Sequence, residues 1–110
     1  MLKINKKIPP FKKVIKVDAD KSISIRSFLI GAISQNISIA RNILESHDVF
    51  STINCLKKLG VKVNFYKNEC VIFGKGINGY NYKNKLTLNA GNSGTFARLI
   101  LGLLVHAKNK

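Results

Sequence analysis

The stretch Asp20-Lys21-Ser22-Ile23-Ser24-Ile25-Arg26 decides the fold, because it predicts a helix start that is dense in polar side chains. Asp20 or Ser22 can cap this helix, since their side-chain oxygens accept backbone N–H groups that lack partners in the first turn. Ser22 and Arg26 share one helix face, and Lys21 lies at the positive end of the helix dipole. The sequence therefore predicts a helix over residues 22–34 with an anion site at its start. A capped, solvated helix start is the simpler alternative.

A second polar turn repeats this arrangement at Gly91-Asn92-Ser93-Gly94-Thr95. Its glycines allow positive φ and a close approach of the backbone to a ligand, and successive N–H groups there can form an anion-binding concavity. Arg98 follows one turn into a helix predicted from Thr95 or Phe96 to about His106. The alternative is a plain strand–turn–helix connection, because neither a P-loop ending nor a G-x-G-x-x-G pattern is present.

The remaining patterns predict a mixed α/β chain. Alternating apolar residues predict strands at 14–17, 37–44, 61–65, 70–73 and 86–89. A second helix is capped by Ser46 and ended by Gly60. The order is thus β-α-β-α-β-β up to Phe73, followed by the start of a second unit. The last helix is apolar on most sides, so we expect it to be buried on several sides within something larger.

The composition fits one small domain with a strongly basic surface. The chain has 110 residues, of which 45% are hydrophobic, and a formal net charge of +14. This charge invites an acidic partner such as nucleic acid, anionic lipid or a phosphorylated metabolite. All but three of the 19 basic residues are lysine, however, so a lysine-rich solvated surface explains most of the charge more simply. A nucleic-acid-binding module would need exposed aromatic residues, whereas Phe65, Phe73 and Phe96 fall in predicted core elements.

Other site classes find little support in the sequence. Cys55 and Cys70 lack the close spacing of a metal or redox motif, which predicts two reduced thiols in a cytoplasmic protein. His47 and His106 do not complete a metal set, so we expect neither a metal nor a cofactor. The basic N-terminal residues precede no signal-like apolar region. The longest apolar run, residues 99–107, is too short to cross a membrane.

The two polar motifs, in register with each other, resemble a known family. Asp20-Lys21-Ser22-Ile23-Ser24 with Arg26, followed by Leu88-Asn89-Ala90-Gly91-Asn92-Ser93-Gly94-Thr95 with Arg98, resembles the amino-terminal part of 5-enolpyruvylshikimate-3-phosphate synthases, also called 3-phosphoshikimate 1-carboxyvinyltransferases. That resemblance implies a two-globule fold built from β-α-β-α-β-β units. Residues 1–18 would belong to the other globule, and residues 19–110 would form a partial domain with the first unit and the start of the second.

The resemblance also implies a chemistry. The family transfers the enolpyruvyl group of phosphoenolpyruvate to the 5-hydroxyl of shikimate 3-phosphate and releases phosphate. Lys21 would contact both substrates, Ser22 and Arg26 would hold shikimate 3-phosphate, and Asn92 and the backbone at Gly94 would face phosphoenolpyruvate. Supporting roles are implied for Asp20, Thr95 and Arg98. The family's catalytic acid/base carboxylate would lie beyond residue 110, so we expect no catalytic residue here and no turnover by the chain alone. The full-length enzyme is expected to be a monomer.

Some positions depart from the family or favour alternatives. Ile25 stands where the family usually has His or Asn, and Ala19 stands where Gly is common. Glu45, His47 and Asp48 precede or open a helix, so capping is their expected role. The sister family, UDP-N-acetylglucosamine enolpyruvyl transferase, is an alternative with the same architecture. It usually carries Lys-Asn where this chain has Lys21-Ser22, so the sequence argues against it.

Overall fold

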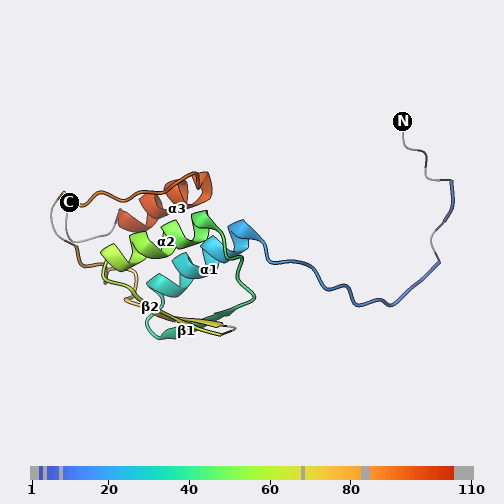
Figure 1. Ribbon diagram of the computed structural model, residues 1–110, viewed down its shortest axis with the longest axis horizontal. Coiled ribbons are helices and arrows are strands. Elements are labelled where there is room, and N and C mark those ends of the chain that lie inside the picture. The colour runs from blue at the N-terminus through green and yellow to red at the C-terminus, as the bar shows by residue number, and fades with distance from the viewer. Residues whose placement is uncertain (1–2, 4, 8, 68, 83–84, 106–110) are drawn as a thin grey trace.

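The computed structural model describes residues 3, 5–7, 9–67, 69–82 and 85–105. Within them the order is α1 (Lys21–Ile33), β1 (Ile37–Arg41), α2 (His47–Lys58), β2 (Lys62–Tyr66), β3 (Glu69–Phe73) and α3 (Gly94–Leu104). Helices α1 and α2 cover one face of the sheet, and α3 lies against α1 on the side away from the sheet (Figure 1). The predicted mixed α/β class is confirmed, as is the order α-β-α-β-β.

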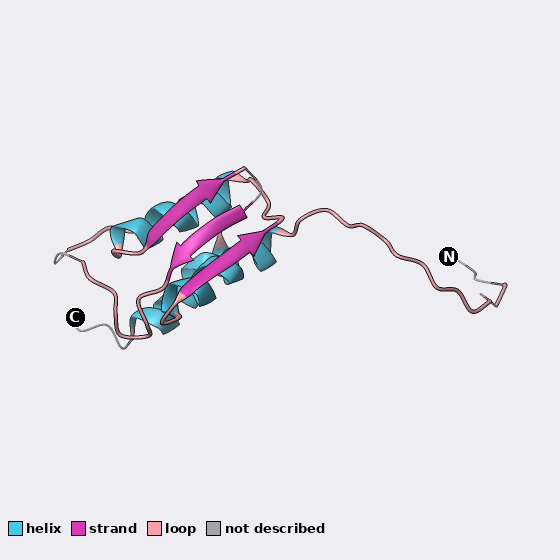
Figure 2. Ribbon diagram, turned by 90° about the horizontal axis from the view of Figure 1, so that it is seen from below, coloured by secondary structure: helices cyan, strands magenta, loops and turns pink. Residues whose placement is uncertain are grey.

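The described part of the sheet has the order β1-β3-β2, with both pairings antiparallel (Figure 2). Cys70 and Ile72 on the central strand are fully buried beneath the helices, whereas Phe73 is only half-buried. Phe65 is 43% exposed and packs beside the ring of Phe50, with ring centroids 6.0 Å apart. The prediction of a core position was therefore wrong for Phe65, which pairs with Cys70 beside the turn of the hairpin.

Helix α1 begins one residue earlier than expected, at Lys21, because Asp20 is the cap: its Oδ1 accepts the Ile23 N–H at 2.7 Å. Ile25 is completely buried, so its apolar side chain fits the core. Near the end of the helix, a Cβ added to Gly31 would lie 2.8 Å from Ile72 Cδ1. The helix therefore approaches β3 too closely for any larger residue to fit without a shift.

Helix α2 confirms the expected cap and stop. Ser46 Oγ accepts the Val49 N–H, and Gly60 adopts a φ of +84° just after the helix. The Val61 N–H then bonds to the Leu56 carbonyl at 3.0 Å and the Gly60 N–H to the Lys57 carbonyl at 3.0 Å. This Schellman arrangement satisfies the last carbonyls and sends the chain directly into β2. The predicted buried stripe is confirmed at Val49, Thr52, Ile53, Leu56 and Leu59.

Two predicted strands do not form. Residues 14–17 extend away from the body, with Val14 95% exposed, and pair with none of the strands in the described part of the chain (Figure 1). Residues 86–89 run along α2 instead of a strand. There the Lys58 ammonium donates to the Thr87 carbonyl and the Cys55 thiol to the Asn89 carbonyl, each at 3.2 Å. Strand β1 ends at Arg41 rather than residue 44, because Asn42 turns the chain with a φ of +53°.

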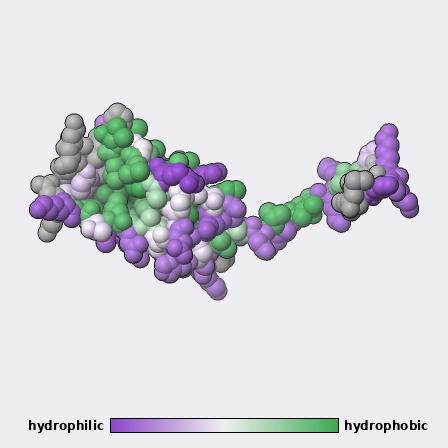
Figure 3. Space-filling model, turned by 90° about the horizontal axis from the view of Figure 1, so that it is seen from above, coloured by the Kyte–Doolittle hydropathy of each residue, from purple (hydrophilic) through white to green (hydrophobic). Residues whose placement is uncertain are grey.

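Helix α3 begins at Gly94, before the predicted start, because Ser93 is its cap and accepts the Phe96 N–H at 3.1 Å. The predicted end, His106, lies outside the described residues. Phe96 and Ile100 are buried, but Leu101 is 67% exposed. The helix is thus only partly buried in this chain, and its burial on several sides within something larger stays a prediction. Figure 3 shows the apolar side chains gathered over α3.

Candidate functional site

The helices α1, α2 and α3 run in the same direction, and their first turns lie at one end of the molecule (Figure 1). Each first turn has a side-chain cap, supplied by Asp20, Ser46 and Ser93 respectively. Each helix start also carries a partial positive charge from its dipole. An end built from several helix starts favours negative charge, so the predicted anion site at α1 lies in a suitable setting.

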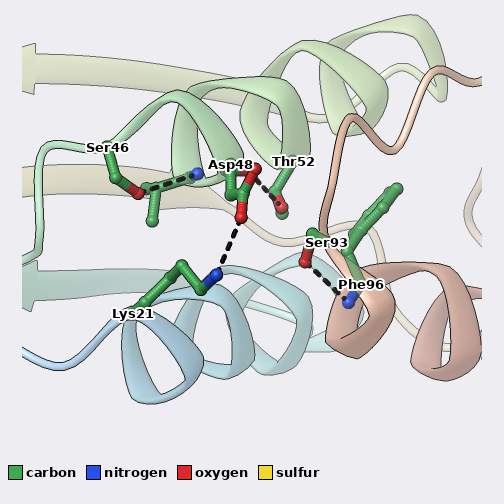
Figure 4. A network of polar contacts seen from close by, with 7 residues as sticks. Lys21, Ser46, Asp48, Thr52, Ser93 and Phe96 are labelled. Atoms are coloured by element: carbon green, nitrogen blue, oxygen red, sulfur yellow. Dashed lines mark hydrogen bonds and ion pairs between the residues drawn. The ribbon is translucent and has the colours of Figure 1, made fainter.

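Asp48 joins these helix starts. From the first turn of α2, its Oδ2 accepts the Lys21 ammonium at 2.9 Å (Figure 4). The backbone N–H of Asn92, in the turn before α3, also faces the Asp48 carboxylate and helps to lower its pKa. The Asp48 side chain is 12% exposed and that of Lys21 47%. The hydrogen bond from Lys21 outweighs the effect of burial and lowers the pKa of Asp48 below its ordinary value, so this carboxylate is ionised at neutral pH.

The turn before α3 fits closely against the start of α2. Gly91 has a φ of +57°, and its N–H donates to Asn89 Oδ1 at 2.9 Å. A Cβ added to Gly91 would lie 3.2 Å from Ser51 Oγ and 3.6 Å from Asp48 Oδ1. The left-handed backbone conformation therefore favours glycine, and a larger residue would also press on Ser51 Oγ. This fit brings the Asn92 N–H to Asp48.

The predicted residues of α1 divide between two places. Asp20 caps the helix, Lys21 bonds to Asp48, and Ser22 is half-buried in the first turn. Arg26 is exposed one turn further on, where it borders an apolar groove of about 260 Å³ between α1 and α3. The apolar groove is otherwise lined by Leu29, Ile30, Ile33, Leu99 and Leu103. Arg26 is therefore on the predicted helix face but outside the Asp48 contacts.

The predicted residues of α3 gather at its first turn. Gly94 is the first helical residue and Thr95, which follows, is half-buried. The Arg98 guanidinium folds back over Gly94. A Cβ added to Gly94 would lie only 3.4 Å from Arg98 Nη1. The absence of a side chain at Gly94 thus gives the guanidinium access to the helix start. Asn92 is exposed, and its backbone N–H faces Asp48.

Asp48 is the residue that sequence reasoning missed. Capping was its expected role, but Ser46 is the cap of α2 and the Asp48 side chain instead reaches Lys21. An acid in the first turn of a helix is common, because it complements the helix dipole. The sequence therefore held no signal for a contact between residues 27 positions apart.

The cysteines and the metal-ligating side chains form no second site in the described part of the chain. Cys55 and Cys70 are free and buried, and burial raises the pKa of both thiols, to about 11 for Cys70. Both are therefore protonated and weakly reactive at neutral pH. Among the described residues, no His, Cys, Asp or Glu side chains group as a metal site would require, and no helix is long and apolar enough to cross a membrane. His106 lies outside these residues.

Comparison with known proteins agrees with the geometry. The family model for EPSP synthase (3-phosphoshikimate 1-carboxyvinyltransferase) matches residues 5–110. The chain belongs to the EPSP synthase family. It is similar to the 3-phosphoshikimate 1-carboxyvinyltransferase of Syntrophomonas wolfei, with 40% identity over 94% of this chain and 24% of that protein. A relative from Thermoanaerobacter is 43% identical over 88% of this chain and 22% of its own length.

Solved structures of the EPSP synthase family share the fold. An EPSP synthase from Acinetobacter baumannii aligns with a TM-score of 0.74 and 35% identity, over 86% of this chain and 21% of that structure. A second structure of the same enzyme aligns with a TM-score of 0.71 over 82% of this chain and 20% of that structure. The chain spans about a quarter or less of the length of the EPSP synthases that it matches.

Proposed function

We propose that this chain forms part of the substrate site of an enzyme that transfers the enolpyruvyl group of phosphoenolpyruvate to the 5-hydroxyl of shikimate 3-phosphate and releases phosphate. One observation carries the proposal. The two polar motifs, 70 or so residues apart, meet at the helix starts through the contacts of Asp48 with Lys21 and Asn92. Family membership and the names of the relatives support the same reaction.

The charge of the site suits both substrates, because both carry several negative charges. Lys21 is half-exposed and uses one of its three ammonium donors on Asp48, which leaves two for ligands. We assign Ser22 and Arg26, one helical turn apart on α1, to shikimate 3-phosphate. Asn92 and the open backbone at Gly94 are assigned to phosphoenolpyruvate, since an anion can approach a glycine at a helix start closely.

Supporting roles follow from the contacts. Asp20 fixes the start of α1 as its cap, and Arg98 lies over Gly94, where it adds positive charge beside the phosphoenolpyruvate position. Thr95 stands in the first turn of α3. Asp48 is engaged by Lys21, so we propose that the acid/base carboxylate of the reaction lies outside this chain. The 110-residue chain then binds substrate without turnover. We place the protein in the cytoplasm as part of a monomeric enzyme, in keeping with its free, buried thiols.

The proposal is tested by titrating the ¹⁵N-labelled chain with shikimate 3-phosphate and with phosphoenolpyruvate while amide shifts are followed. We expect shikimate 3-phosphate to shift the first turn of α1 and phosphoenolpyruvate to shift the turn at Asn92. Loss of a charge-assisted contact costs about 1.5–3 kcal/mol, so Lys21→Ala should weaken binding roughly ten- to a hundredfold. Lys6→Ala is the matched control, because Lys6 lies in the exposed N-terminal segment. Equal affinities in the two variants would overturn the proposal.

Two further titrations separate the alternatives. UDP-N-acetylglucosamine should leave the spectrum unchanged, whereas shifts at α1 would favour the sister transferase. A single-stranded oligonucleotide should bind weakly and lose its affinity steeply as salt rises, since lysine contacts to phosphates release counterions. Binding that survives about 0.2 M salt would instead favour a nucleic-acid-binding module.

A further inference from the structure

We propose that Asp48 is a positioning residue that couples Lys21 to the Asn92–Gly94 turn, so that the α1 and α3 parts of the site respond to one bound anion together. Its position supports this role. The carboxylate lies between the starts of α1 and α3 and accepts a hydrogen bond from the Lys21 ammonium at 2.9 Å. It also faces the turn before α3, where an added Gly91 Cβ would lie 3.6 Å from its Oδ1 and the Asn92 N–H helps to lower its pKa. One side chain on α2 therefore holds a side chain from α1 and the backbone before α3.

The other groups around this carboxylate leave it little freedom to move. Its side chain is 12% exposed. Gly91 approaches so closely that a Cβ there would lie 3.6 Å from Asp48 Oδ1, and His47, the preceding residue of α2, has its imidazole beside the same turn. The Thr52 hydroxyl donates to the Asp48 carbonyl at 3.0 Å within α2. A carboxylate held on several sides can fix the partners that bind it.

Electrostatics explains why positioning is needed. Lysine carries a compact charge on a flexible four-carbon stem, and the positive helix starts around it repel an ammonium. Without a counter-charge, the half-exposed Lys21 would turn outward into solvent. Asp48 holds it at the helix starts. The same negative charge opposes the approach of an anion, so a role in direct attraction is ruled out by its sign.

Because the charge of Asp48 is negative, removing it tests whether Asp48 positions its partners or has a merely structural role. Asp48→Asn keeps the shape but removes the charge, so it should strengthen non-specific attraction of anions while loosening Lys21 and the turn. Lys21 is followed by ¹³C-methyl signals after reductive methylation of the lysines, and Lys21→Met identifies its signal. Asn92 is followed by the exchange rate of its backbone amide. Ser46→Ala is the structural control, because it removes the cap of α2 without touching either partner.

In Asp48→Asn, we expect the Lys21 methyl signal to move to the position of freely mobile lysines, and the Asn92 amide to exchange about tenfold faster, as loss of a charge-assisted hydrogen bond implies. Asp48→Glu should partly restore the Lys21 methyl signal and the slow exchange of the Asn92 amide. Ser46→Ala should change neither, although it destabilises the chain. Unchanged signals in a folded Asp48→Asn variant, or equal changes in Ser46→Ala, would overturn the proposal.

Inorganic phosphate probes the coupling. In the original chain, the Lys21 and Asn92 signals should respond to phosphate with one midpoint. In Asp48→Asn, the two midpoints should lie at least about fivefold apart, the lower end of the usual range of coupling between sites. The inference rests on the proposed function only in assuming that the site binds an anion. If phosphate produced no response at all, the proposed function would lose support, while the comparison without phosphate would still decide the role of Asp48.

Lys21→Met covers the case in which Asp48→Asn fails to fold. Because Asp48 then loses its main partner, the Asn92 amide, 71 positions further along the chain, should still exchange faster. Lys6→Met, in the exposed segment, should leave it unchanged. An unchanged Asn92 exchange rate in Lys21→Met would refute the coupling.

Discussion

Gly31→Ala should destabilise the chain, although alanine is normally the better helix residue. Gly31 lies inside α1 and faces β3. An added Cβ would stand 2.8 Å from Ile72 Cδ1, 3.2 Å from its Cγ2 and 3.3 Å from its Cβ. Ile72 is fully buried on the central strand, so the side chain has no free space to enter. The helix or the strand must therefore shift.

The magnitude follows from two opposing contributions. Replacing a helical glycine with alanine stabilises by about 1 kcal/mol, whereas inserting a methyl group into a close-packed core costs about 1–3 kcal/mol. Because two of the three close atoms lie near the backbone of Ile72, we place the cost in the upper half of that range. The net expectation is a loss of about 1–2 kcal/mol in the free energy of unfolding.

Gly102→Ala is the matched control, because Gly102 is an exposed residue of α3 whose added Cβ meets nothing within 4 Å. It should stabilise by up to about 1 kcal/mol. Urea unfolding followed by far-ultraviolet circular dichroism measures both variants. Ile72→Val removes Cδ1, so Gly31→Ala should cost less in that background, by about 0.5 kcal/mol or more. If both glycine variants were stabilised alike, the close approach of α1 to β3 would be refuted.

Two more predictions concern the helix starts and the apolar groove. The folded-state pKa of Asp48 is lowered, so its ion pair stabilises the chain at neutral pH and this contribution is lost as the pH falls through that pKa, below about 4. The melting temperature of the unchanged chain should thus fall more steeply on acidification than that of Asp48→Asn. Parallel curves of melting temperature against pH would contradict this. The exposed Ile30 and Leu99 in the groove between α1 and α3 should promote self-association, and salt should strengthen it by screening the charge of +14. Ile30→Lys should reduce the sedimentation coefficient at high salt, and an unchanged monomer in both proteins would contradict this.

Local chemistry made several features predictable from the sequence. The cap at Ser46 and the stop at Gly60 depend on side chains and backbone conformations within a few residues, so the bounds of α2 were nearly correct. The cap at Ser93 is equally local, but Gly94 is typical of a turn, so the sequence predicts a helix start at Thr95 or Phe96 instead. Glycine at the first helical position keeps the helix start open for the Arg98 guanidinium.

Strand formation depends on a neighbour, which the local pattern does not contain. Residues 14–17 and 86–89 have strand-like sequences, yet a strand needs another strand to satisfy its N–H and C=O groups. The carbonyls of Thr87 and Asn89 find side-chain donors on α2 instead. The chain from 86 to 91 is thereby laid along α2. That path brings Gly91 against Ser51 and aligns Asn92 with Asp48.

The same reasoning accounts for the part of the site that the sequence concealed. Lys21 and Gly94 could be proposed from the sequence because each belongs to a motif whose chemistry is contained within one turn of chain. Asp48 gains its role only when α1, α2 and the turn before α3 pack side by side, and its local position suggests nothing beyond an acid at a helix start. A buried carboxylate with a lysine partner is costly to leave unpaired. Its two contacts therefore bind the separate motifs into one site, and substitutions at Asp48 should act on both motifs at once.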